Sequence, residues 1–314
     1  MKTAQLSLSA LLALTLSLTG CSNDENLPGG ENDGRVAIRV SSNIDVTDGA
    51  SKPGTRAAND AWEANDAIGI FMLNGSTADT YSNIAYTTAD GNGTFAPQGT
   101  TIFLPVDGTG RDFVAYYPYQ SLMSGSSYSI DLSSQTDQSA IDLMSSEKEN
   151  GTNSTVKGIT KSAPAVKFRF HHRLCKLSLS VKAGTGLTAA DLSGLTITLG
   201  GQKTVGTFDV LASGAVTATG EGNQTVTLKT AANGQTSEAI VMPSDDFSGM
   251  ALTFATTNSG TYKWNVSSTS ATKFEAGKVY KFNITINKTG INVTATIEDW
   301  GAGNGESGED GSAE

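Results

Sequence analysis

Apolar and polar side chains alternate along much of the chain, and this period of two is the pattern of β-strands that bury one face. The clearest alternating runs lie at residues 36–40, 166–170, 177–181, 195–199, 262–266, 280–286 and 291–297. Helical periodicity is scarce by comparison. The pattern therefore predicts an all-β protein.

Turns that suit antiparallel hairpins separate these runs. Examples are Asn74-Gly75, Asp107-Gly108 and Asn233-Gly234, which are residue pairs that readily adopt the backbone of tight turns. The chain has 314 residues, a length for which about two domains are expected. Two antiparallel β-sandwiches fit the spacing of the turns better than one large barrel does.

Composition indicates where the domains begin and end. Residues 145–163 are mostly polar and offer little to bury, so the first sandwich is predicted at residues 35–160 and the second at residues 161–300. Residues 301–314 contain five glycines and no apolar side chain larger than alanine. This tail is predicted to be disordered.

The amino terminus has the pattern of an export signal. Lys2 precedes an apolar run at residues 6–18, which is too short to cross a bilayer as a helix of about 20 residues. The run ends at Leu18-Thr19-Gly20-Cys21, which resembles the lipobox of bacterial lipoproteins. We therefore expect removal of the signal peptide, residues 1–20, and attachment of diacylglycerol to Cys21, which anchors the chain to a membrane. The alternative is an ordinary signal peptide followed by an unrelated cysteine.

Acidic residues are concentrated near the two ends of the chain. The formal net charge is −10, and four acidic residues lie in residues 22–33 and four more in residues 303–314. Residues 21–34 are predicted to form an extended acidic tether. Its start, residues 22–26, resembles the surface-export signal of some Gram-negative lipoproteins, although a linker that only holds the fold off the lipid headgroups would have the same composition. The net negative charge would repel a phosphate backbone, so nucleic acid is excluded as a partner.

The two histidines are the obvious candidates for a metal site. On a strand, His171 and His172 point to opposite faces, so they cannot both bind one ion without a bend. The apolar phase shifts between Phe170 and Cys175, which predicts a bulge or bend at the histidines. Cys175 begins a row of alternating apolar residues and is therefore predicted to be an unreactive core thiol.

Motifs for catalysis are weak. Ser145 and Lys148 have the Ser-x-x-Lys spacing of acyl-enzyme hydrolases, but the partner motifs and the helical setting are missing. We find no paired carboxylates, phosphate-binding loop or nucleophile elbow in the sequence. We therefore predict that the protein is not an enzyme and needs no metal or other cofactor.

Several segments together resemble the fimbrillin (Mfa-like) family of type V pilus proteins. The resemblance spans about residues 35–300, and the segments that carry it are 55–57, 66–71, 142–144, 168–177, 242–243, 261–264, 274–286 and 297–300. It implies two transthyretin-like β-sandwich domains. It also implies export as a lipoprotein, followed by cleavage by an arginine-directed protease that removes the lipid and the first strand.

The resemblance assigns residues to these steps. Cleavage would occur between Arg56 and Ala57, in a segment of small residues that a protease can reach. The strand that leaves would be residues 35–44, with Val36, Ile38 and Val40 facing the core. A strand from another pilin subunit, of the same or a related type, would then fill the gap by donor-strand exchange.

The donor strand is less clear from the sequence. The acidic tail lacks alternating apolar residues, so a donor would have to be the last strand, with Ile291, Val293, Ala295 and Ile297 on its apolar face. If that strand stays packed, the protein can accept a strand but not donate one, as a tip subunit would.

Other roles remain open. Without cleavage at Arg56, the protein would keep Cys21 and its first strand and serve as an anchor subunit in the outer membrane. It could also be a monomeric surface lipoprotein that binds a glycan or a host protein. Tyr116, Tyr117 and Tyr119 discriminate between these roles, because exposed tyrosines could form a sugar platform whereas buried ones belong to a core. The expected location is the surface of the outer membrane, and the fimbrium after processing.

Overall fold

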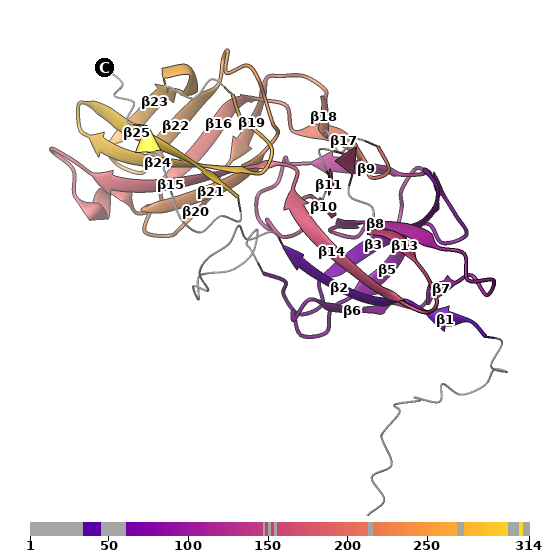
Figure 1. Ribbon diagram of the computed structural model, residues 1–314. Coiled ribbons are helices and arrows are strands. Elements are labelled where there is room, and N and C mark those ends of the chain that lie inside the picture. The colour runs from indigo at the N-terminus through magenta and orange to yellow at the C-terminus, as the bar shows by residue number, and fades with distance from the viewer. Residues whose placement is uncertain are drawn as a thin grey trace, which may run out of the picture. The chain divides into compact units, whose positions relative to one another are not determined.

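The computed structural model describes residues 34–44, 61–146, 148–149, 152–153, 156–212, 216–268, 273–300 and 308–309. These residues contain no α-helix, and their short 3-10 helices are η1 (Ala189–Leu192) and η2 (Val266–Ser268). The predicted all-β class is confirmed (Figure 1). The signal peptide, Cys21, residues 21–33 of the tether and the pair Arg56-Ala57 lie outside the described residues.

The N-terminal half is built on a nine-stranded sheet with the order β13-β8-β10-β14-β2-β6-β5-β3-β4. Its strands are β2 (Arg39–Ile44), β3 (Ala67–Asn74), β4 (Thr77–Ala78), β5 (Ile84–Thr87), β6 (Thr94–Pro97), β8 (Arg111–Tyr117), β10 (Met144–Ser146), β13 (Val156–Ile159) and β14 (Ala165–His172). An additional pairing of β3 with β8, from Gly69↔Tyr116 to Leu73↔Asp112, closes the ladder on itself. The closed ladder surrounds an apolar core to which β2 and β14 both contribute.

The C-terminal half contains two sheets. The six-stranded sheet has the order β20-β21-β15-β24-β25-β26, and the four-stranded sheet has the order β19-β16-β22-β23. The strands are β15 (Cys175–Ala183), β16 (Thr196–Gln202), β19 (Gln224–Thr227), β20 (Lys229–Thr230), β21 (Thr236–Val241), β22 (Ala251–Thr256), β23 (Gly260–Asn265), β24 (Lys278–Asn287), β25 (Gly290–Asp299) and β26 (Gly308–Glu309).

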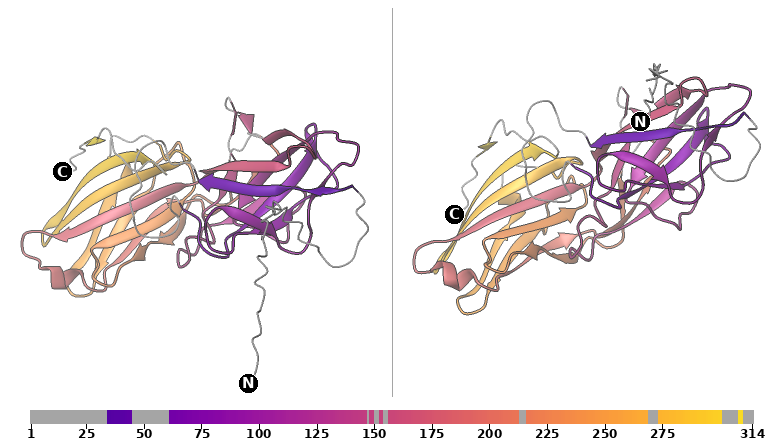
Figure 2. Two further views of the ribbon diagram at one scale, coloured as in Figure 1. Left: turned by 60° about the horizontal axis from the view of Figure 1, so that its bottom comes forward. Right: turned by 90° about the horizontal axis from the view of Figure 1, so that it is seen from below.

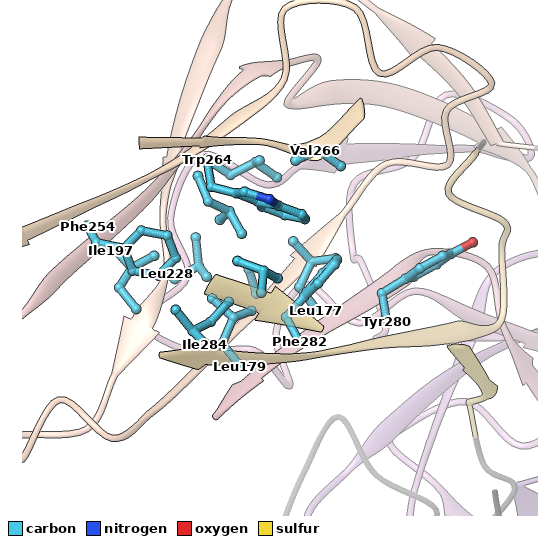
Figure 3. Close-up of a cluster of buried hydrophobic side chains, with 14 of the residues drawn as sticks. Leu177, Leu179, Ile197, Leu228, Phe254, Trp264, Val266, Tyr280, Phe282 and Ile284 are labelled. Carbon is cyan, nitrogen blue, oxygen red and sulfur yellow. The ribbon is translucent and has the colours of Figure 1, made fainter. Parts of the chain in front are cut away.

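One apolar core lies between these two sheets. Figure 3 shows how side chains from both sheets point toward one another, among them Leu177, Trp264 and Phe282. Trp264 on β23 meets Phe282 on β24 edge to face, with ring centroids 5.5 Å apart. The strict alternation of β15 and β24 produces this core, because every second side chain faces the opposite sheet.

A third apolar core joins the two halves. It contains Phe71 and Tyr116 from the nine-stranded sheet, and Phe208 and Ile240 from later strands. A three-stranded sheet also connects the halves, with β9 (Ser127–Asp131), β17 (Val205–Asp209) and β18 (Val216–Thr219) in the order β18-β17-β9. Two short pairs complete the strands: β1 (Val36–Ala37) with β7 (Phe103–Leu104), and β11 (Lys148–Glu149) with β12 (Thr152–Asn153).

The domain limits 35–160 and 161–300, and the transthyretin-like form of the two halves, remain predictions. The strand that follows the predicted boundary, β14, pairs with β2 and β10 of the nine-stranded sheet. Of the tail that was expected to be disordered, the structure describes β26, which pairs with β25 at Ala295↔Glu309 and Thr296↔Gly308. Among the described residues, no helix is long and apolar enough to span a bilayer.

Candidate functional site

The first strand occupies an interior position of the nine-stranded sheet. β2 runs parallel to β14, from Ala165↔Arg39 to Phe170↔Ile44, and antiparallel to β6 at Val40↔Phe95 and Ser41↔Thr94. Both views in Figure 2 show β2 (indigo) beside β14 (pink), although the two strands are far apart in sequence. We call the position between β14 and β6 the strand slot.

Four side chains of the first strand point into the core. Ile38, Val40, Ser42 and Ile44 are 6%, 3%, 5% and 4% exposed. The three apolar ones belong to the core that contains Trp62 and the phenylalanines of β14. Burial of each contributes about 1.5–3 kcal/mol.

The predicted continuous strand at residues 35–44 is divided in the structure. β1 pairs with β7, whereas β2 pairs with β14 and β6. The break occurs at Ile38, whose amide donates to the carbonyl of Ile102 (3.1 Å). Val36 therefore belongs to a different pairing from Val40, and it is half-buried. The division arises because the chain changes partners, which alternation alone does not show.

Ser42 has an environment that the sequence did not indicate. Its Oγ is buried without a hydrogen-bond partner among the described residues, and its amide donates to the carbonyl of Gly93 (2.8 Å). Gly93 has a φ of +80°, and a Cβ at this glycine would lie 2.4 Å from the Ser42 carbonyl oxygen. The backbone of the first strand therefore passes too close to Gly93 to leave room for a side chain there.

The candidate donor strand β25 has a different setting. It forms a hairpin with β24 that is paired from Lys278↔Asp299 to Asn287↔Gly290. Val293 is buried, and Ile291, Ala295 and Ile297 are half-buried against the C-terminal core. The end of the strand is fixed by Trp300, whose amide donates to the carbonyl of Gly277 (2.7 Å).

His172 and Trp300 meet at the junction of the two halves. Their rings are stacked, with centroids 3.9 Å apart and 5° between the planes. Nδ1 of His172 lies 2.8 Å from Oδ1 of Asp142, and both side chains are almost fully buried. Because Trp300 directly follows β25, this stack holds the end of the candidate donor strand against the other half of the molecule.

The histidines and Cys175, which the sequence offered as candidates for metal binding or catalysis, are part of the packed structure. No group of three or more His, Cys, Asp or Glu side chains in the described part of the chain could hold a metal ion. The predicted bend at the histidines is confirmed, because β14 ends at His172 in the nine-stranded sheet and β15 starts at Cys175 in the six-stranded one. Cys175 is a free, fully buried thiol whose pKa is raised well above its ordinary value by burial, as predicted for an unreactive core residue.

Ser145 and the tyrosines are also part of the packed structure. The Ser145 hydroxyl accepts a hydrogen bond from Nε of Arg173 (2.6 Å), and burial lowers the pKa of Arg173 to about 10. Tyr116 and Tyr117 are buried, and burial raises the pKa of both. Tyr119 is half-buried. The core interpretation of Tyr116 and Tyr117 is therefore confirmed, and they cannot line a surface platform.

Comparison with known proteins agrees with these observations. The profile of the fimbrillin-like family matches residues 55–300, and the chain is 45% identical to a candidate fimbrium subunit of Bacteroides uniformis, Fim1C, over 97% of each chain. The chain belongs to the fimbrillin-like family. This confirms the resemblance found in the sequence.

Solved structures show the same relationship. A candidate cell adhesion protein from Bacteroides uniformis is 39% identical with a TM-score of 0.74, covering 86% of this chain and 100% of that one. The tip fimbrial protein Mfa3 from Porphyromonas gingivalis, solved with a C-terminal truncation, shares the fold at 12% identity with a TM-score of 0.51, covering 85% of this chain and 100% of that one.

Membership of the family gives the protein its general role. This fimbrillin-like chain is a structural or adhesion subunit of fimbriae and not an enzyme. It is exposed at the cell surface as part of a fimbrium, in which it assembles with other pilin subunits.

The sequence predicted part of the inward face of the first strand. It identified Ile38 and Val40 but did not single out Ser42 and Ile44, although the apolar alternation continues as far as Ile44. Ser42 is polar, but it lies midway between Val40 and Ile44 in the period of two, so the alternation already places it on the same inward face. The structure shows the resulting burial, with β2 paired to β14 on one side and to β6 on the other.

Proposed function

We propose that this fimbrillin-like chain is a structural pilus subunit that matures by losing its first strand. The precursor is exported, lipidated at Cys21 and held at the outer membrane. An arginine-directed protease then cuts between Arg56 and Ala57, and the lipid leaves with β1 and β2. A strand of another pilin subunit fills the strand slot, and the resulting polymer supports adhesion to a host or glycan ligand.

The observation that carries the proposal is the position of β2. Its inward side chains complete the core of the N-terminal half, yet β2 lies upstream of Arg56 in the chain. After a cut at Arg56, no peptide bond would connect β2 to the rest of the molecule. Non-covalent contacts alone would retain it, namely those of β2 with β14, β6 and the core and those of β1 with β7.

Loss of the strand would leave the N-terminal half incomplete. Three apolar side chains, each worth about 1.5–3 kcal/mol of burial, would no longer cover the core. Unpaired backbone groups of β14 and β6 would face the open slot. An incoming strand restores both the hydrogen bonds and the apolar contacts, and such head-to-tail contacts give an open-ended filament.

An anchor subunit is the second candidate, and the close packing of β2 favours it. In that role the chain keeps Cys21, its lipid and its first strand, and it ends the pilus at the membrane.

The packed β25 and the stacked Trp300 favour a subunit that accepts a strand without donating one, as a tip subunit does. The buried Tyr116 and Tyr117 remove the feature that favoured a monomeric glycan-binding lipoprotein.

The test is the intact mass and amino-terminal sequence of the protein recovered from surface fimbriae. A start at Ala57 without lipid is the expected result. Arg56→Ala should leave the lipidated precursor uncut, and Lys52→Ala, which removes a cation from the same segment, should leave processing unchanged. A complete chain that begins at a lipidated Cys21 in assembled fimbriae would overturn cleavage and favour the anchor role.

A further inference from the structure

A cavity of about 360 Å³ lies at one end of β16 in the C-terminal half. Its lining comes from the end of β16 with Lys203, from β18 and the turn after it, and from the segment 242–250, which connects β21 to β22. The volume is near the lower end of the range of about 300–1,000 Å³ that is typical of small-molecule sites. We call this space the β16 cavity. It shares no lining residue with the strand slot.

Two methionines form the apolar part of the β16 cavity. Met242 and Met250 are 2% and 6% exposed, and Pro243, which follows Met242 in the chain, is half-buried. Methionine side chains are unbranched and polarisable, so they adapt to surfaces of irregular shape. They present an apolar surface to a molecule that enters the cavity.

Gln202 adds a buried amide to the lining. The residue is 1% exposed, and its Nε2 donates a hydrogen bond to Sδ of Met250 (3.0 Å). This is the only hydrogen bond that its side chain forms with the described residues. A thioether is a weak acceptor, whereas buried amides normally have stronger partners. The second N–H and the Oε1 of Gln202 are therefore left for a ligand to use.

Three charged side chains stand at the rim of the cavity. Lys203, Asp245 and Asp246 line it and are exposed. None of the described residues forms a hydrogen bond or an ion pair with the Lys203 ammonium or the Asp245 carboxylate. Asp246 accepts the amide of Ser248 through Oδ1 (2.7 Å), which leaves its Oδ2. The rim therefore offers one cationic donor and several acceptors, and its net charge is negative.

The two aspartates belong to a segment that is already fixed. The amide and the carbonyl of Ser244 are both hydrogen-bonded to the backbone of Phe274 (2.9 and 2.7 Å), and the Ser244 hydroxyl donates to the carbonyl of Asp246 (2.8 Å). The buried Phe247 packs against Phe274, with ring centroids 4.5 Å apart. Binding therefore requires little ordering of this segment, which lowers its entropic cost.

The lining narrows the class of ligand. Its net negative charge disfavours phosphates and acidic sugars, and a purely apolar molecule would cover the Gln202 amide without bonding to it. A free amino acid would use Lys203 and only one of the two carboxylates. A neutral sugar suits the whole lining, because each hydroxyl both donates and accepts hydrogen bonds and the C–H face of the ring is apolar.

We propose that the β16 cavity binds the terminal, uncharged sugar residue of a glycan. Hydroxyl groups of the sugar donate to Asp245 and Asp246 and accept from Lys203. A further hydroxyl bonds to the amide of Gln202, and the C–H face of the ring covers the two methionines. The inference rests on the adhesive role in the proposed function and gives that role a site.

The test is the binding of sugars to the purified full-length, uncut protein. Glucose, galactose, mannose, fucose and N-acetylglucosamine are the probes in NMR titrations, and a glycan array presents the same sugars at chain ends. We expect at least one of them to bind. Lys203→Gln should weaken this binding about tenfold or more, because a hydrogen bond from a charged group is lost. Lys263→Gln is the matched control, since Lys263 is exposed on β23 outside the lining, and it should bind like the wild type.

A second variant closes the cavity without changing its charges. A Cβ at Gly222 would lie 3.9 Å from Cε of Lys203, which is an ordinary contact. Gly222→Leu should therefore fill the rim and abolish binding with the Tm unchanged. Gly290→Leu, where a Cβ has nothing within 4 Å, should keep both. The site is overturned if no probe sugar binds the wild type or if binding survives both Lys203→Gln and Gly222→Leu. Binding of free methionine, but of no sugar, would overturn the sugar as the ligand.

The failure of this inference is distinguishable from the failure of the proposed function. Sugar binding is measured in the uncut protein, so it does not depend on cleavage at Arg56. If no sugar binds but chains from fimbriae begin at Ala57, the role of a cleaved pilus subunit stands and the cavity is not its adhesive site. If a sugar binds but the chains begin at Cys21, the proposed processing fails and the cavity serves an uncut lipoprotein.

Discussion

Each half of the molecule contains one parallel pair among the strands that the structure describes. In the N-terminal half β14 pairs with β2, and in the C-terminal half β15 pairs with β24, from Lys176↔Val279 to Ala183↔Ile286. Both β2 and β24 bury every second side chain in an apolar core. The pairs differ in how the second strand is attached to the rest of the chain.

β24 is joined directly to a second long strand. It is preceded by residues of the C-terminal half and continues into the β25 hairpin at Asn287↔Gly290. β2 is connected to the rest of the fold only through residues 45–60, which include Arg56. A cut after Arg56 therefore leaves β2 with only the short β1 on its fragment, whereas a cut before β24 leaves β24 and β25 on one fragment that keeps its hairpin and its pairing with β15.

The comparison indicates that the number of packed strands on a severed fragment, more than the burial of one strand, separates a permanent strand from an exchangeable one. Within one chain the local concentration of a strand near its slot is high, and a cut removes this advantage. The same buried contacts then behave as a bimolecular complex that a competing strand can displace. Four predictions test this difference, beginning with the largest effect.

Cutting the chain beside each parallel strand should have opposite outcomes. A cut after Arg56 should let residues 1–56 dissociate on dilution, with a loss of several kcal/mol of apolar burial and a fall in the Tm of the N-terminal half. A cut at a protease site engineered into residues 269–272, just before β24, should release nothing, because the fragment holds both β24 and β25 in the C-terminal core. Gel filtration and mass spectrometry of the cut proteins measure both, and equal release from the two would contradict the comparison.

The close approach of Gly93 to the first strand should make it sensitive to substitution. Gly93→Ala should reduce the free energy of unfolding by about 2–4 kcal/mol, because a left-handed backbone is strained for alanine and the new Cβ would overlap the Ser42 carbonyl. Gly75→Ala is the control. It has a similar φ of +66° with nothing within 4 Å, so it should lose only about 1 kcal/mol. Urea denaturation measures both, and equal losses would show that the strand does not crowd Gly93.

Equivalent truncations in the two parallel strands should cost the intact chain similar stability, but only the one in β2 should change the release of the fragment after a cut at Arg56. Ile44→Val in β2 and Ile286→Val in β24 remove one methylene from buried positions, so each should cost about 0.5–1.5 kcal/mol in the intact chain. After a cut at Arg56, Ile44→Val should speed the release of the fragment about two- to tenfold. Ile286→Val should leave that rate unchanged. If both substitutions sped the release of the fragment equally, they would act by destabilising the whole protein and not by weakening the contacts of β2.

Strands could be predicted from the sequence because alternation is a property of each strand alone. The rows of β15 and β24 were found in this way, and so was the inward face of the first strand at Ile38 and Val40. Partners could not be predicted, because pairing joins distant segments. No local pattern indicates that Ser42 lies opposite Phe168 or that β1 and β2 belong to different ladders.

In the candidate site, too, contacts between residues distant in sequence could not be predicted. The apolar residues of the slot follow from hydrophobicity, but the close approach of the Ser42 carbonyl to Gly93 and the pairing of Ser42 with Phe168 are seen only in the structure. The His172–Trp300 stack likewise joins residues that no sequence motif connects. The sequence pointed to the bend at His172 and not to the ring that covers it.

The smallest expected difference between the halves is electrostatic. In the N-terminal half Nε of Arg111 lies 2.6 Å from Oδ2 of Asp79, and the two side chains are 16% and 22% exposed. In the C-terminal half Nζ of Lys273 lies 2.7 Å from Oε1 of Glu275, with side chains 49% and 45% exposed. The hydrogen bond from Arg111 holds the pKa of Asp79 below its ordinary value of 3.8. The ionised pair therefore stabilises the fold fully at pH values above the ordinary pKa of 3.8. This contribution is lost as the pH falls through the lowered pKa of the folded protein.

Asp79→Asn should accordingly cost up to about 1 kcal/mol at pH 7, and the difference from the wild type should shrink as the pH falls below about 4. Glu275→Gln, which breaks the more exposed pair, should give no measurable change at pH 7 because water and salt screen it. Urea denaturation at a series of pH values measures both variants. A cost for Asp79→Asn that is the same at pH 3 and pH 7 would mean that packing or the hydrogen bond donated by the Thr80 amide, and not the charge of Asp79, supplies the stability.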